Sequence, residues 1–235
     1  MNVTTRIVSA EKKAARGDAV ITLYARWLDF YHRRRRYFYL ALAAVAVLLG
    51  GVMGYTYYLR HQEQQAQQLL GQVLPLYEQG KYREALDGAQ NMQGLLAIAR
   101  SYGNTDAGNL ARFYAADALY RLGDYEQARA LWAAFKTDDP MLAASALAGQ
   151  AAVYENQGER ARAAELYRRA AERYANPVST PQYLLQAGRN YEAAGNYAEA
   201  QKMYETLRTR YAESAQAAEA EIALARVAAR AAQAR

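Results

Sequence analysis

The sequence has no cysteine, only four prolines and only two histidines among its 235 residues. Without cysteine there is no disulfide framework, no thiol nucleophile, no thiolate metal site and no lipid-anchored cysteine. With so few prolines, and without runs of valine, isoleucine and threonine, the chain has few signals that break helices or favour strands. The composition therefore predicts an all-α protein.

Residues that could support catalysis are also scarce. His32 and His61 flank a long apolar segment on opposite sides, so they cannot cooperate as acid and base. No phosphate-binding glycine loop or nucleophile elbow occurs. Asp138 and Asp139 precede Pro140 without a second ligand cluster, which favours a helix cap over a metal site. We therefore expect no enzyme, no metal, no cofactor and no small-molecule substrate.

The positive charge is concentrated at the N-terminus. The formal net charge is +6, and residues 1–36 contain nine Lys and Arg against three Asp and Glu, whereas residues 37–235 contain twenty of each. A nucleic-acid-binding domain would carry its excess on the folded surface. Here the excess lies beside an apolar segment, which favours membrane lipid and disfavours nucleic acid as a partner.

Residues 37–59 form that segment, YFYLALAAVAVLLGGVMGYTYYL, which has no formal charge over twenty-three residues. A helix of this length reaches about 34 Å and crosses a hydrocarbon core of about 30 Å. Tyrosines at both ends are typical of the two headgroup regions. The segment is predicted to be a transmembrane helix.

The arginine cluster Arg33–Arg36 directly precedes this helix, so the positive-inside rule places residues 1–36 in the cytoplasm and residues 60–235 across the membrane. The alternative is a cleavable signal peptide. An n-region of thirty-six residues and the lack of a small-x-small site in GYTYYLRHQ favour an uncleaved anchor.

Two further features concern the membrane. Gly50 and Gly54 form a GxxxG pattern that could pack against another helix, although glycine is frequent in membrane helices generally. Residues 19–36 form a basic amphipathic helix, which either lies on an anionic membrane surface or docks with a partner.

Four similar sequence motifs recur in the C-terminal part: EQGKYREAL, RLGDYEQAR, NQGERARAA and AAGNYAEAQ. Their glycines, Gly80, Gly123, Gly158 and Gly195, are separated by 43, 35 and 37 residues. This spacing is close to the tetratricopeptide period of about 34. It predicts a right-handed superhelix of helix-turn-helix repeats near 66–92, 109–140, 144–177 and 181–212, followed by a capping helix at 214–234.

The glycine and alanine of each motif have a structural explanation. The glycine ends the first helix of the repeat with positive φ, and the alanine five residues later allows close packing of the second helix. These alanines are Ala85, Ala128, Ala163 and Ala200. The bulky position that follows is Trp132, Tyr167 or Tyr204, but only Ala89 in the first repeat, which is the degenerate one.

The insertion NMQGLLAIARSYGNTDAGN, the anchor and the repeats together resemble a membrane-anchored tetratricopeptide family that includes the ancillary subunit of the bacterial SecYEG translocon. The resemblance covers roughly residues 20–225. It implies a bacterial inner-membrane protein with periplasmic repeats, beside the SecYEG channel and linked to periplasmic chaperones or translocated chains. The sequence departs from that family in its longer basic cytoplasmic segment and in its four fairly regular repeats.

The concave groove along the first helices of the repeats is the predicted protein-binding surface. The alternative is that its residues are ordinary packing or solvated positions. The expected function is a membrane-tethered interaction scaffold, and the alternative is a structural subunit of another envelope or secretion assembly. By the repeat register, the groove residues are Leu74, Tyr77, Glu78, Phe113, Asp117, Tyr120, Arg121, Leu185, Arg189 and Glu192.

Overall fold

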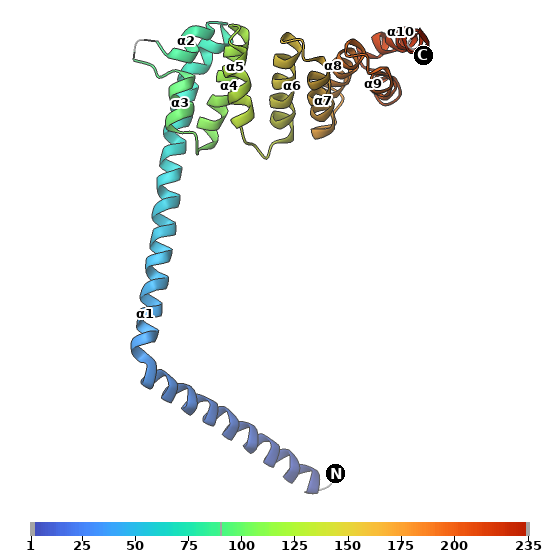
Figure 1. The fold of residues 1–235 in the computed structure, drawn as a ribbon. Coiled ribbons are helices and arrows are strands. Elements are labelled where there is room, and N and C mark those ends of the chain that lie inside the picture. The colour runs from blue at the N-terminus through green and yellow to red at the C-terminus, as the bar shows by residue number, and fades with distance from the viewer. Residues whose placement is uncertain (1–2, 90, 234–235) are drawn as a thin grey trace. The chain divides into compact units, whose positions relative to one another are not determined.

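The computed structural model describes residues 3–89 and 91–233, with side chains described from residue 36 onward. The described part is all helical, as predicted, and contains no strand (Figure 1). The side chains of residues 1–35, and with them most of the predicted amphipathic face of 19–36, lie outside the described residues. The helices are α1 (Val3–Glu78), α2 (Tyr82–Asp87), α3 (Leu95–Ser101), α4 (Asp106–Arg121), α5 (Tyr125–Ala134), α6 (Pro140–Asn156), α7 (Arg160–Arg173), α8 (Thr180–Ala193), α9 (Tyr197–Arg210) and α10 (Ala217–Gln233).

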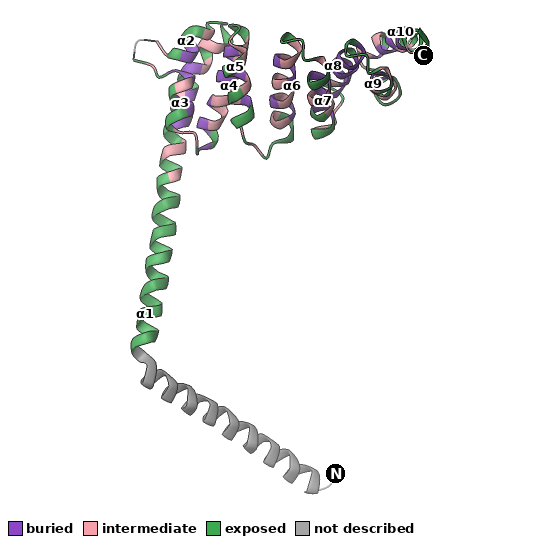
Figure 2. Ribbon diagram, in the orientation of Figure 1, coloured by how far each residue is buried: buried purple, intermediate pink, exposed green. Residues whose placement is uncertain are grey.

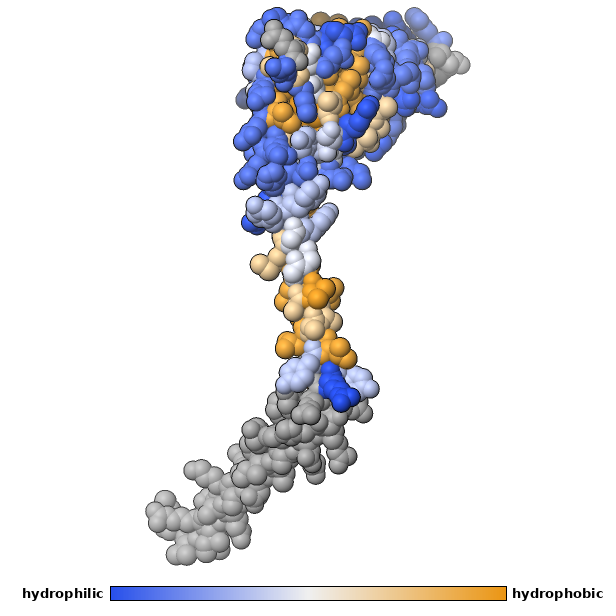
Figure 3. Space-filling view, turned by 90° about the vertical axis from the view of Figure 1, so that its left-hand side faces the viewer, coloured by the Kyte–Doolittle hydropathy of each residue, from blue (hydrophilic) through white to orange (hydrophobic). Residues whose placement is uncertain are grey.

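The chain divides into two compact units, Met1–Leu59 and Arg60–Arg235. In the first unit, α1 exposes large apolar side chains from Tyr37 to Tyr58, visible as an uncovered stretch in Figure 2 and as an apolar band in Figure 3. Among the described residues one helical stretch, Arg36–Glu78, is long and apolar enough to cross a membrane, and none of its most apolar window is buried. Exposed apolar surface of this extent is unfavourable in water.

The second unit is built from pairs of helices joined by the repeated glycine motif. The four glycines have φ values of 77° at Gly80, 86° at Gly123, 78° at Gly158 and 78° at Gly195, which confirms the predicted left-handed conformation. At Gly123, the glycine N–H donates to the Tyr120 carbonyl at 3.0 Å, and the next N–H donates to the Leu119 carbonyl at 2.9 Å. The same pair of bonds closes all four helices, because this conformation satisfies the last carbonyls.

Substituting Gly123 with alanine should therefore destabilise the repeats by about 1–2 kcal/mol, because a Cβ is disfavoured at positive φ. Gly71 is the matched control. It lies in the interior of α1 without positive φ and with open space around it, so Gly71→Ala should stabilise the chain by up to about 1 kcal/mol. Urea unfolding in mild detergent, followed by circular dichroism, measures the free energy of unfolding of both variants. If both substitutions change it in the same direction, the positive φ of Gly123 is not the cause of its effect.

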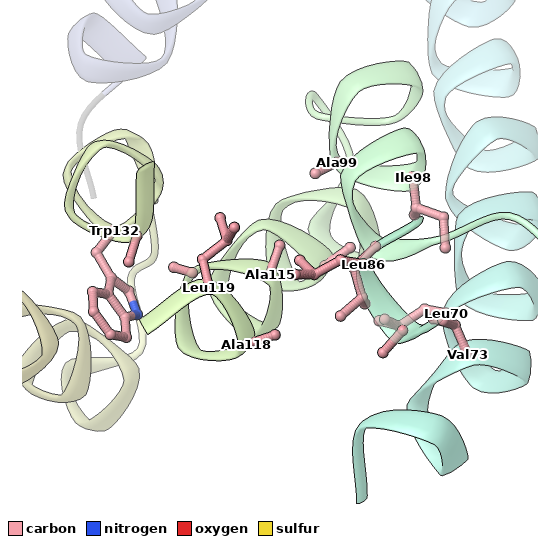
Figure 4. Packing of buried hydrophobic residues seen from close by; sticks show 14 of the residues in the cluster. Leu70, Val73, Leu86, Ile98, Ala99, Ala115, Ala118, Leu119 and Trp132 are labelled. Carbon is pink, nitrogen blue, oxygen red and sulfur yellow. The ribbon is translucent and has the colours of Figure 1, made fainter. Parts of the chain in front are cut away.

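The core of the unit follows the repeat positions. The alanines after each glycine, Ala85, Ala128, Ala163 and Ala200, are all 0% exposed. Trp132, Tyr167 and Tyr204 are buried beside them. Two hydrophobic clusters result, one from α1 to α6 and one from α6 to α10, and Figure 4 shows part of the first.

The first repeat departs from the pattern. Its second helix, α2, ends at Asp87, well before the predicted end near residue 92, because Gly88 has a φ of 90°. The insertion then forms the short helix α3, whose Leu95 and Ile98 are buried in the same cluster as Leu86. Figure 4 shows Ile98 and Leu86 in this cluster. The insertion thus supplies apolar contacts that the short α2 lacks.

Candidate protein-binding surface

A cavity of about 740 Å³ opens between the first helices of repeats one and two and the segment that joins α5 to α6. It lies wholly within the second unit. Its apolar lining comes from α1, α4, the residue that ends α5 and the start of α6, and most of these side chains are half-buried and therefore reachable. They are Leu70, Leu74, Leu110, Phe135 and Leu142.

Most of the remaining lining residues are polar, and the charged ones among them are mainly acidic. Four carboxylates, those of Glu63, Asp106, Asp138 and Asp139, face a single ammonium group, that of Lys136. In contrast, many other acidic residues of the unit are paired with arginines along their own helix, as in Glu126 with Arg129 and Glu159 with Arg162. The cavity is therefore a local concentration of negative charge around an apolar floor.

Helix capping explains why two of these carboxylates are present. Glu63 Oε2 accepts from the Ala107 N–H at 3.2 Å, in the first turn of α4, where Thr105 also caps. Asp139 Oδ1 accepts from the N–H groups of Met141 and Leu142 at 2.8 and 3.1 Å, in the first turn of α6. The interpretation of Asp139 as a helix cap is confirmed, and both helix N-termini beside the cavity carry their own anions.

Three of the predicted groove residues form one polar cluster between repeats one and two. The Tyr77 hydroxyl donates to Asp117, and Arg121 Nε donates to the same oxygen at 2.5 Å. Burial, together with the hydrogen bond to Asp117, raises the pKa of Tyr77. Arg121 Cζ also lies 5.3 Å from the ring centroid of Tyr82. The cluster connects α1, α2 and α4.

Phe113 and Tyr120 are half-buried and lie in aromatic contacts. The Phe113 ring centroid is 5.2 Å from that of Phe135, so Phe113 supports a side chain that lines the cavity. The Tyr120 ring is 5.9 Å from Trp132, and its hydroxyl accepts a bond of 2.8 Å from Asn156 Nδ2. Phe113 therefore packs α4 against the end of α5, whereas Tyr120 also connects repeat two to α6.

Repeat four presents a different arrangement. Leu185 is 3% exposed and Glu192 is 6% exposed, so the structure places both in the interior and neither offers an open groove surface. Glu192 is held by Arg226 and Arg230 of the capping helix, at 2.7 and 2.9 Å. Arg189 is exposed and its Nε donates to Glu219 at 2.9 Å. Side chains of α10 therefore occupy this part of the predicted groove.

In the first unit, Gly50 and Gly54 lie on an open face of α1. A Cβ added at either position would meet no atom within 4 Å. Their role in helix packing stays a prediction.

The sequence matches the tetratricopeptide repeat family over residues 110–140, 145–177 and 182–214. The helix pairs, the glycine turns and these matches define the class as a tetratricopeptide-repeat fold. No curated protein matches the sequence.

Among solved structures, similar chains include two forms of a putative kinesin light chain from Podosopora anserina with nearly identical TPR-like repeats. One form carries a single substitution and has 18% identity and a TM-score of 0.50, over 75% of this chain and 87% of that one. The other form has 18% identity and a TM-score of 0.48, over 75% and 88%. The first likeness shows the fold and no more.

Sequence reasoning identified Leu74 in the cavity but missed most of its rim. The repeat register predicts which side of a helix faces the groove, and Leu110 could have been found by extending it one turn back along α4. Lys136, Thr137 and Asp138 belong to the non-helical end of repeat two, between α5 and α6, for which the helix register makes no prediction.

Proposed function

We propose that this protein is a membrane-tethered scaffold that binds other proteins through the cavity between its first two repeats. The observation that carries the proposal is an open cavity of about 740 Å³ with an apolar floor, which is within the usual size range of binding sites. Its walls come from helices of adjacent repeats, the arrangement by which solenoid proteins form binding surfaces. The repeat fold itself supports a protein partner and a non-catalytic role.

The exposed apolar stretch of α1 supports the tether. A tether confines the cavity to the membrane surface and raises its effective concentration for partners located there. The charge pattern supports a cytoplasmic N-terminus, with the repeats on the opposite side. The resemblance to the translocon-associated family supports the finer proposal, in which the chain lies in the bacterial inner membrane beside SecYEG and its periplasmic repeats receive chaperones or translocated chains.

Photocrosslinking in cells tests this function. A photoreactive amino acid is placed at Gln67, which lines the cavity, and at Val52 in the apolar stretch, with Glu221 on α10 as the exposed control. We expect protein adducts at Gln67 that are missing at Glu221, and adducts between Val52 and SecY, identified by mass spectrometry.

The two crosslinking positions test separate parts of the proposal: Val52 tests the membrane partner, and Gln67 tests the cavity as the binding surface. Adducts from Val52 to a different envelope complex would favour the structural-subunit alternative and overturn the translocon partner. Equal protein adducts at Gln67 and Glu221 would overturn the cavity as the binding surface.

A further inference from the structure

We infer that the cavity binds a protein segment in which an apolar side chain is flanked by lysine or arginine. This inference rests on the proposed scaffold function and specifies the chemistry of its ligand. It depends on three observations: the apolar floor, the unpaired carboxylates of the rim and the occupied helix N-termini.

The floor selects an apolar anchor. Leu74, Leu110, Phe135 and Leu142 are half-buried, so each presents part of its apolar surface to the cavity. Covering apolar surface is favourable by about 25 cal/mol per Å². A leucine-sized or aromatic side chain from a partner would remove this surface from water, and binding energy in protein interfaces concentrates in such anchors.

The rim selects positive charge beside that anchor. Asp106 and Asp138 make no side-chain hydrogen bond or ion pair with any residue that the structure describes. Each can therefore accept a lysine or arginine from a ligand without first losing an internal partner. With four carboxylates against one lysine, the rim is complementary to a cationic segment and repels an acidic one.

Helix N-termini usually attract anions, and two of them, those of α4 and α6, lie beside this cavity. Here their N–H groups are already bonded to Glu63 and Asp139. A phosphate or an acidic peptide would have to displace these carboxylates or approach them directly. The N-termini therefore do not reverse the preference for cations.

Peptide binding to the full chain tests the inference. The protein is placed in nanodiscs of phosphatidylcholine, whose zwitterionic lipid does not attract cationic peptides. Fluorescence anisotropy compares a labelled peptide of leucines flanked by lysines with the same peptide flanked by glutamates. We expect the lysine peptide to bind about tenfold more tightly, with affinity falling as salt rises.

Two variants assign the binding to this cavity. Asp106→Asn with Asp138→Asn should weaken the lysine peptide by about threefold to tenfold. The matched control, Asp87→Asn with Glu221→Gln, removes two exposed acids elsewhere and should leave binding unchanged. Gly71→Trp should abolish binding, since Gly71 lines the cavity and has room for a side chain. Its control is Gln72→Trp, one residue along the exposed surface.

Tighter binding of the glutamate peptide, or equal losses in the rim and control variants, would overturn the inference. These results would leave the scaffold function standing if Gln67 still gave specific adducts in cells. If Gln67 gave no specific adducts, the scaffold function would fail, whatever the peptides did.

Discussion

Replacing Tyr204 with alanine is expected to lower the free energy of unfolding by about 3–5 kcal/mol. Tyr204 is 0% exposed, and its ring packs against the backbone of Gly188 on α8 so closely that a Cβ there would clash with the ring. Its hydroxyl also donates to Glu192 at 3.3 Å. Removal of the ring leaves a cavity between α8 and α9 that the neighbouring helices cannot fill.

A double-mutant cycle with Gly188→Ala isolates this packing. In the natural background the added methyl must displace the Tyr204 ring and should cost about 1–3 kcal/mol. In the Tyr204→Ala background the same methyl enters the vacated space, so its cost should vanish or reverse. Tyr204→Phe keeps the ring and should cost only about 1 kcal/mol.

Urea unfolding of the full chain in mild detergent, followed by circular dichroism, provides these values. Additive effects of Tyr204→Ala and Gly188→Ala would contradict the contact. A loss for Tyr204→Phe as large as that for Tyr204→Ala would show that the hydroxyl contributes more than the ring.

The repeated glycine motifs predicted much of the second unit because each motif determines the structure of its own few residues. Each glycine sits where the chain needs positive φ, and each following alanine sits where two helices approach most closely, so the sequence pattern and the geometry have the same cause. The short α2 and the helix formed by the insertion could not be predicted in this way. Their positions depend on Gly88 and on apolar contacts to α1, which are not repeated.

The candidate site was harder to predict for a related reason. The repeat register states which side of a helix faces the groove but not whether a later element covers that side. Glu192 has the register of a groove residue, yet Arg226 and Arg230, on a helix beyond the last repeat, reach it. In the same way, the rim of the cavity depends on Lys136 and Asp138, which lie in the non-helical segment between α5 and α6, where the helix register does not apply.

Breaking the contact between Glu192 and α10 is also expected to lower the free energy of unfolding by a large amount. Hydrogen bonding to Arg226 holds the pKa of Glu192 below its usual range, and Arg230 acts in the same direction. Replacing both arginines with alanine leaves a nearly buried carboxylate without its cations, and we expect a loss of about 3 kcal/mol at neutral pH. Arg189→Ala is the control, because its pair with Glu219 is exposed and should contribute less than about 1 kcal/mol.

The stabilisation by Glu192 should depend on pH in a defined direction. Because the folded-state pKa of Glu192 is lowered, its stabilising contribution is complete above the unfolded-state pKa and is lost as the pH falls through the folded value. In the double variant, burial without the arginines raises that pKa, so acid relieves the penalty. The difference in unfolding free energy between the natural chain and the variant should therefore shrink from neutral pH to about pH 3. A difference that stays constant over this range would mean that α10 is held by packing and not by Glu192.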